Sequence, residues 1–271
     1  MFVDEAWQMP LHLFKGVQNY ARTVVGVGDV GQLPPIDAAA NPWRGDERYN
    51  PYRAWPAALE KESSTRSFEL PAVWRPNANQ LHLWRAFYRE WEGDLTCVAA
   101  PGDRRIDLQG LRGDSARIWE QVATGTPTLL EVTGVEPAEA PDIDYQLLAV
   151  LEQLLEDLVR EGFDVVSTDY DSDGNPKNET RLEWGDPSSG PRVVLLATRN
   201  AAVSEAEQIA ERLRDAHNLA PGVLTASTVD RWQGQTNAIT VAIHPLSGAD
   251  ELDEFNSAFG RLAVSCTWAT H

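Results

Sequence analysis

Apolar residues along the chain form short runs with two different periods. After Thr23 and Arg192, the segments 23–27 and 192–197 are uninterrupted by polar residues, and the first is rich in β-branched residues, which is typical of strands buried in a parallel sheet. Apolar residues spaced three and four apart predict helices over 143–162 and 202–216, each packed by one face. This alternation of strands and helices predicts an α/β fold in which parallel sheets are flanked by helices.

Weaker patterns predict the remaining segments. We expect a helix from Asn79 to Trp91, a strand from Thr128 to Val132, and a strand, loop and strand over 223–243. Residues 37–67 have no sustained period and predict an irregular connection with short helices. Residues 93–141 predict loops with one or two short elements.

The N-terminal residues place two acidic strand ends side by side. Phe2 and Val3 run directly into Asp4 and Glu5, and the strand over 23–27 runs into Gly28 and Asp29. The segment between them is about the length of one short crossover helix, which gives a βαβ unit. Ligands bind at the carboxyl ends of strands in such sheets. Asp29 and Gln32 would then approach the same phosphate site as Glu5.

Simpler interpretations of these residues stay open. Asp4 and Glu5 could cap the helix that follows, since acids suit the first turn of a helix. Gly28 and Asp29 could form an ordinary turn. The polar loop Gln-Leu-Pro-Pro at 32–35 makes an ordinary turn less favoured, because it fixes a rigid loop at a strand end.

Composition narrows the function classes. The chain has 271 residues, 42% of them hydrophobic, and a formal net charge of −18. This charge argues against nucleic-acid binding through bulk electrostatics, although a local basic groove is compatible with it. No apolar run approaches the ~20 residues of a membrane helix. Cys97 and Cys266 lie far apart without metal-like spacing, so we expect a reduced, cytoplasmic protein with no membrane contact.

Two further patterns have a structural and a functional interpretation. Four aromatic residues in the irregular connection could stack on bases, but we favour a role in pinning the loop to its domain: Trp43, Tyr49, Tyr52 and Trp55. The run Asp169 to Asn175 resembles the first half of a calcium loop. Its twelfth position is Thr180 instead of Glu, so a solvated hairpin or insertion tip near 164–191 is the better interpretation.

The spacing of the two acidic strand ends resembles a known family. Val-Asp-Glu-Ala at 3–6, followed by Gly-Asp-x-x-Gln-Leu-Pro-Pro at 28–35, is similar to motifs II and III of superfamily 1 helicases. Motif II is the Walker B element. The resemblance implies that Asp4 holds Mg²⁺, that Glu5 polarises the attacking water and that Gln32 senses the γ-phosphate. Asp29 would lie at the same nucleotide.

Two later segments extend the resemblance. The aromatic-Arg pair at Trp74 and Arg75 resembles motif IV, in which the arginine reaches the nucleotide. A planar guanidinium suits this role because it neutralises phosphoryl charge; alone, Arg75 would be read as a surface ion pair. In the same family the strand, turn and helix near Thr198 and Asn200 face the nucleic acid, which implies phosphate contacts there.

The segment Thr-Val-Asp-x-x-Gln-Gly at 228–234 resembles motif V. The resemblance implies that Thr228 contacts nucleic acid and that Gln233, Gly234 and Gln235 lie at the nucleotide. Glycine at 234 would let the backbone approach a ligand closely. Gln235 stands where Glu is common in the family, so the ribose or nucleotide contact would be weaker or made differently.

Two family features are missing from this sequence. Residues 255–271 resemble motif VI, but Trp268 stands where the family has the arginine that acts on the γ-phosphate, and Arg261 is about two helical turns away. Such an arginine contributes ~10³–10⁵ in rate. The chain also contains no Gly-x-x-x-x-Gly-Lys-Ser/Thr, the Walker A loop that cradles phosphates. We therefore expect a chain truncated at both ends relative to the family.

The resemblance implies a partial RecA-like domain over 1–67 and a second RecA-like domain over 68–271, both of the P-loop NTPase fold. The implied function is that of a helicase-like ATPase fragment, with Mg²⁺ and ATP as ligands and single-stranded DNA or RNA as partner. Two alternatives stay open. The chain could be an inactive fragment or pseudo-ATPase that only binds, or half of a split ATPase whose Walker A loop comes from an upstream polypeptide.

Overall fold

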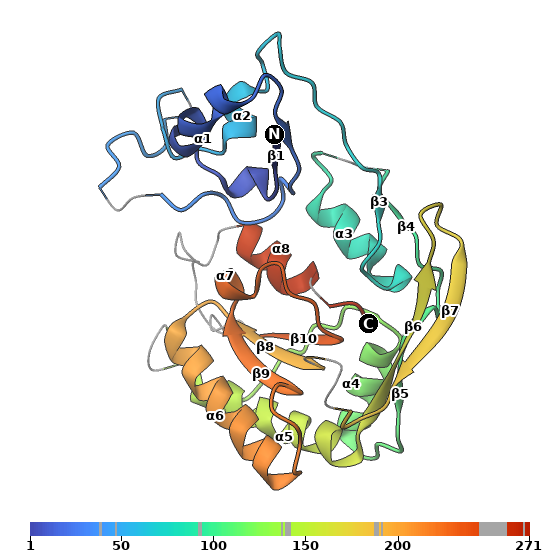
Figure 1. Cartoon of the computed structure of the whole chain (residues 1–271). Helices are drawn as coiled ribbons and strands as arrows, with labels where there is room; N and C mark the ends of the chain where they lie inside the picture. Colours follow the sequence, from blue (N-terminus) through green and yellow to red (C-terminus); the bar gives the residue numbers. More distant parts are fainter. Residues whose placement is uncertain are drawn as a thin grey trace. The chain divides into compact units, whose positions relative to one another are not determined.

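The chain is a mixed α/β protein with several small parallel sheets, as a computed structural model shows (Figure 1). It divides into two compact units, Met1–Leu70 with Phe259–Ala263 and Pro71–Ala258 with Val264–His271. The α/β class predicted from the sequence is confirmed. The structure describes residues 1–37, 40–46, 48–91, 94–136, 138, 142–186, 190, 192–243, 259–267 and 269–271.

The first unit is built on a small βαβ arrangement. Strands β1 (Phe2–Val3) and β2 (Val25–Gly26) pair in parallel, and helix α1 (Leu11–Val17) connects them, as predicted. The short helices η1 (Ala6–Gln8), η2 (Gln18–Tyr20) and α2 (Trp55–Leu59) complete the unit. The prediction that 23–27 is buried is wrong: the sheet is two-stranded, and Val25 and Val27 are 42% and 53% exposed.

Trp55 anchors the irregular connection to this unit. Its ring is buried and stacks on Phe14, with ring centroids 4.1 Å apart. Tyr52 contacts the His12 ring edge-on at 4.8 Å. The pinning role predicted for the aromatic residues is therefore confirmed for these two. Trp43 and Tyr49 are about half exposed or more.

The core of the second unit surrounds a parallel sheet of order β10-β8-β9. Its strands are β8 (Val193–Ala197), β9 (Leu224–Thr228) and β10 (Ile239–Ile243), and every residue of the central strand β8 is buried. Helices α5 (Tyr145–Glu161) and α6 (Asn200–Ala216) pack against this sheet through the apolar faces that their periodicity predicted (Figure 1). Asp144 caps α5 by accepting the Leu147 amide at 3.0 Å, and Gly162 ends it with a φ of +76°.

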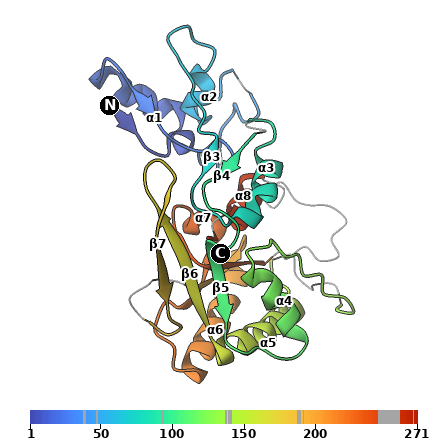
Figure 2. The same ribbon diagram turned by 90° about the vertical axis from the view of Figure 1, so that its right-hand side faces the viewer.

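An antiparallel sheet of order β5-β6-β7 lies in the same unit (Figure 2). It contains β5 (Arg104–Leu108) and the hairpin of β6 (Phe163–Tyr170) and β7 (Pro176–Leu182). The hairpin predicted near 164–191 is thus present, and β7 is largely exposed. The first residues of β6 are buried, because Phe163 and Val165 belong to the main core. At the tip, the Asp171 carboxylate accepts the amides of Asp173 and Asn175, which is the contact of a turn.

The remaining elements differ most from the predictions. Strands β3 (Ala72–Val73) and β4 (Thr96–Cys97) pair in parallel, and η3 (Ala78–Gln80), α7 (Val229–Trp232) and α8 (Phe259–Thr267) are short. The helix predicted to Trp91 ends earlier, as α3 (Leu81–Phe87), and a ten-residue helix α4 (Asp114–Ala123) lies where mainly loops were expected. The strand predicted over 128–132 is wrong: these residues are irregular, and Leu129 is 94% exposed. Among the described helices, none combines the length and the apolar character needed to cross a bilayer.

Candidate functional site

Asp4 and Glu5 follow β1 directly, and both are exposed. The Asp4 Oδ1 accepts the Glu5 amide at 2.9 Å, and the Glu5 Oε2 accepts the Gln8 Nε2–H at 3.0 Å. Glu5 makes no capping bond to η1, and α1 begins after Pro10. Helix capping therefore does not explain this acid pair.

The backbone at Glu5 is strained. Its φ is +49°, in the left-handed region that residues with a Cβ rarely adopt. Such a conformation costs on the order of 1–3 kcal/mol and occurs preferentially at functional sites. The strained residue is thus the same residue for which the sequence predicted a chemical role.

Gly28 brings the second strand end against the first. A Cβ at Gly28 would lie 2.8 Å from the Ala6 amide nitrogen and 3.2 Å from that of Trp7. The Ala6 amide also donates to the Val27 carbonyl at 2.8 Å. Only glycine lets the two loops approach so closely. The acid pair and the Gly28 loop therefore lie side by side, as the βαβ reading predicted.

Asp29 organises the loop that follows β2. Its Oδ1 accepts the Gly31 amide at 2.8 Å, and its Oδ2 accepts the Gln32 Nε2–H at 2.9 Å. The first contact is that of an ordinary turn, and the second fixes the amide of Gln32 beside the carboxylate. Both side chains are half-buried. Four of the predicted nucleotide-site residues thus lie at adjacent strand ends of one unit.

The start of α8 packs on this loop. A Cβ at Gly260 would lie 2.6 Å from the Gln32 carbonyl oxygen and 3.1 Å from the Leu33 amide nitrogen. Arg261, the next residue, is half-buried. Trp268, which stands at the predicted arginine position, lies outside the described residues.

The other predicted residues belong to the second unit. Thr198 follows β8, Asn200 begins α6, and Thr228 ends β9. Because Ala197 and Thr228 are register partners in the parallel sheet, these three residues lie at the same carboxyl edge. The Thr228 hydroxyl accepts the Arg231 amide at 3.2 Å and so caps α7.

Arg75 and the glutamines of the same unit differ in position. Arg75 is half-buried and follows β3, which belongs to the separate β3–β4 sheet. Gln233 is half-buried after α7, whereas Gly234 and Gln235 are exposed. The φ of Gly234 is +86°, so the turn itself requires a glycine there.

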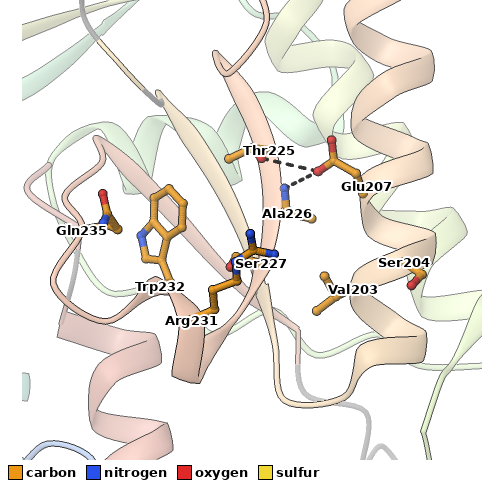
Figure 3. A pocket seen from close by; sticks show the side chains of 9 residues that line it. All are labelled: Val203, Ser204, Glu207, Thr225, Ala226, Ser227, Arg231, Trp232 and Gln235. Carbon is orange, nitrogen blue, oxygen red and sulfur yellow. Dashed lines mark hydrogen bonds between the residues drawn. The ribbon is translucent and has the colours of Figure 1, made fainter.

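A pocket of about 660 Å³ opens between α6 and the carboxyl end of β9 (Figure 3). Of the predicted residues only Gln235 lines it. The Trp232 indole forms one wall beside Gln235, and the Arg231 guanidinium lies near Ser227 (Figure 3). Its lining is completed by residues of α6 and β9: Val203, Ser204, Glu207, Thr225 and Ala226.

Glu207 does not make the pocket anionic. Its Oε2 accepts the Ala226 amide at 2.8 Å, and its Oε1 pairs with the Arg214 guanidinium at 2.9 Å. The Glu207 carboxylate is thus paired with a cation, whereas Arg231 is exposed and lines the pocket together with the Trp232 ring. This combination of a cation, an aromatic face and hydroxyl groups suits a planar, negatively charged ligand.

Sequence reasoning missed most of this pocket. Arg231 and Trp232 occupy the two unspecified positions of the segment 228–234 that resembles motif V, so a cation next to an aromatic residue was the only available signal. Ser204 and Glu207 reach the pocket only because α6 packs against β9 in space.

The described residues contain no cluster of three or more His, Cys, Asp or Glu side chains placed to hold a metal ion. This finding is compatible with Mg²⁺ bound together with a nucleotide, which needs only one or two carboxylates and the phosphates. No protein-family model matches the chain, and no curated protein matches it.

Proposed function

We propose that the chain is part of a superfamily 1 helicase-like ATPase with RecA-like domains, in which Mg²⁺-nucleotide hydrolysis at the first unit is coupled to single-stranded nucleic acid. One observation supports this most strongly. Two adjacent parallel strands are followed closely by Asp4–Glu5 and by Gly28–Asp29, and Gln32 is hydrogen-bonded to Asp29. Carboxylates at neighbouring carboxyl ends of parallel strands are placed for phosphate chemistry.

Each side chain has a role that its contacts permit. Asp4 uses Oδ1 for the Glu5 amide, and its exposed carboxylate has further acceptor sites for Mg²⁺. The metal would neutralise phosphate charge when bound. Glu5 is held by Gln8 through Oε2, so its carboxylate has a fixed position from which to accept a proton from water. Gln32 would respond to the terminal phosphate through the amide that Asp29 holds.

The pocket of the second unit supports the nucleic-acid part of the proposal. Proteins bind single strands by stacking bases on aromatic rings and by pairing phosphates with cations. Trp232 and Arg231 supply both groups in one pocket. Thr198, Asn200 and Thr228 lie at the same sheet edge and add short polar groups for backbone contacts.

A second candidate is a binding module without turnover. The sequence has no Walker A loop, and Trp268 replaces the motif VI arginine, so both phosphate-stabilising elements are missing from this chain. A split enzyme would receive the Walker A loop from a separate upstream polypeptide.

Mg²⁺-dependent ATP hydrolysis with oligo(dT) separates these possibilities. We would measure it for the chain alone and mixed with the polypeptide encoded upstream, together with Glu5→Gln and with Glu62→Gln as an exposed control in the same unit. Hydrolysis that occurs in the mixture but not with the chain alone, and that is abolished by Glu5→Gln and unaffected by Glu62→Gln, indicates a split enzyme. Oligonucleotide binding without hydrolysis in either sample indicates the binding module. Absence of both contradicts the proposal.

A further inference from the structure

The orientation of the Trp232 ring depends on a buried residue behind the pocket. Asn237 is 3% exposed, and its Oδ1 accepts the Trp232 Nε1–H at 3.0 Å. Trp232 itself is half-buried and lines the pocket. The bond to Asn237 is therefore the polar contact that fixes the ring about its long axis.

The amide of Asn237 can adopt only one orientation. Its Nδ2 donates to the Ile239 carbonyl at 2.7 Å and to the Thr240 hydroxyl at 2.8 Å. A carbonyl can only accept, and an indole N–H can only donate. Rotating the amide by 180° would break the Ile239 and Trp232 contacts together. The acceptor is thus locked toward the indole.

The backbone of Asn237 is anchored as well. Its carbonyl accepts the amide and the hydroxyl of Thr270, each at 3.1 Å. Asn237 and Ala269 form an isolated parallel bridge, and the His271 ring contacts the Ser167 hydroxyl of β6 at 2.8 Å. Asn237 is consequently held from β10 and from the 269–271 segment, which makes it a rigid support.

We propose that Asn237 is a positioning residue, which holds the Trp232 indole in the orientation that lets a base of a single-stranded nucleic acid stack on it. The ligand class rests on the proposed function; the support of the ring does not. A ring held in advance loses less conformational freedom on binding, so the support increases affinity without touching the ligand.

The alternative is that Asn237 only stabilises the start of β10. That role would affect folding, but it would not act through the indole. A double-mutant cycle separates the two roles, because Trp232→Phe keeps an aromatic ring and removes the N–H.

The experiment measures oligo(dT) affinity for the wild type, Asn237→Ala, Trp232→Phe and the double variant. We expect Asn237→Ala to weaken binding by about tenfold, within the range that base stacking contributes. In the Trp232→Phe background the same change should have an effect below about twofold. Thr236→Val, an exposed neighbour, is the control and should bind like the wild type. An equal loss in both backgrounds overturns the proposal.

A second readout needs no ligand. In ¹⁵N-tryptophan-labelled protein, the Trp232 indole resonance is the one that disappears in Trp232→Phe, and its hydrogen exchange should be slow in the wild type and fast in Asn237→Ala. Unchanged exchange overturns the proposal. If the wild type does not bind oligo(dT), the proposed nucleic-acid function fails, and indole exchange still decides the role of Asn237.

A third variant covers the case in which Asn237→Ala does not fold. Thr240→Val removes one of the two acceptors that orient the amide, with little change of shape. It should speed indole exchange and weaken binding by a smaller factor than Asn237→Ala. Wild-type exchange and affinity in this variant would contradict the proposal.

Discussion

At the scale of single residues, the contact between Gly28 and the loop after Glu5 leaves no room for a side chain, since a Cβ at Gly28 would lie 2.8 Å from the Ala6 amide nitrogen. The Ala6 amide is bonded to Val27 and cannot move away from an added methyl group without losing that bond. Glu5, the residue before Ala6, has the strained positive φ. A change at Gly28 therefore acts directly on the acid pair.

We predict that Gly28→Ala destabilises the protein by about 1–3 kcal/mol, the usual cost of overpacking, and shifts the acid pair. The matched control is Gly16→Ala inside α1, where a Cβ would meet no atom within 4 Å. Because alanine favours helix over glycine, the control should gain roughly 0.5–1 kcal/mol. Urea unfolding measures the change in unfolding free energy for both variants. Equal changes in the two variants would show that the structure can accommodate a Cβ at Gly28.

A second residue-scale prediction concerns His271. Its pKa is lowered from 6.5 to about 4, chiefly by burial; its bond to the Val166 carbonyl opposes this shift, and the charges of nearby Arg104 and Arg192 add to it. The folded state thus keeps a neutral ring at a pH where the unfolded chain binds a proton. Stability from this group is fully present above pH 6.5 and is lost as the pH falls from 6.5 toward 4, by up to about 3 kcal/mol.

Unfolding free energies at pH 7.5 and 4.5 would test this. Wild type should lose more stability between the two values than His271→Gln, in which the titrating ring is absent. His82→Gln, which replaces an exposed histidine, should behave as the wild type does. If His271→Gln loses as much unfolding free energy between pH 7.5 and 4.5 as the wild type does, the carboxylates account for the acid sensitivity and the prediction for His271 is wrong.

At the scale of elements, α6 protects the outer edge of β9. In this parallel strand Leu224 and Ala226 direct their backbone groups away from β8. Glu207 accepts the Ala226 amide at 2.8 Å, and Arg214 donates to the Leu224 carbonyl at 2.5 Å. The Glu207–Arg214 ion pair, whose members are two helical turns apart on α6, thus satisfies one amide and one carbonyl on the edge of β9. Without these partners the edge could pair with a strand of another chain.

We predict that Arg214→Met destabilises the second unit by about 1–3 kcal/mol, because the Leu224 carbonyl loses its partner, and that it promotes self-association. Arg212→Met is the matched control on the same helix: Arg212 pairs with Glu152 at 2.8 Å but is 50% exposed. An exposed pair contributes roughly 0.2–1 kcal/mol. Chemical unfolding and light scattering report the two effects, and a monomeric, fully stable Arg214→Met would contradict the edge-protection role.

Local patterns predicted some elements well for identifiable reasons. Helices α5 and α6 have long apolar stripes, and α5 also has a capping Asp144 and a terminal Gly162. The residues of each helix were therefore sufficient to predict it. The adjacent strand ends at Glu5 and Gly28 followed from the short βαβ spacing.

Other features depend on contacts that no local pattern contains. Helix α4 has its apolar residues Ala116 and Trp119 at helical spacing, but glycines on both sides made the segment read as loop. The Leu-rich run at 128–132 resembles a strand but has no strand partner among the described residues. The Asn237–Trp232 bond and the Glu207 contact join side chains through packing, so the pocket emerged only from the structure.

At the scale of the whole molecule, the net charge of −18 opposes the approach of a nucleic acid. Any binding must come from a few local cations, and Arg231 is the guanidinium that lines the pocket. Each phosphate neutralised on a single strand changes the slope of log K against log salt by about 0.7. The contribution of Arg231 can thus be separated from the charge of the molecule.

We predict that Arg231→Gln weakens oligo(dT) binding at low salt and reduces the magnitude of the salt slope by about 0.7, because one phosphate contact is lost. Arg212→Gln removes the same charge from α6 outside the pocket lining, so it controls for the change in net charge. Fluorescence anisotropy between low and moderate salt gives both slopes. A local contact requires that only Arg231→Gln alters the slope, whereas equal changes in both variants would mean that long-range repulsion, and not the pocket, governs binding.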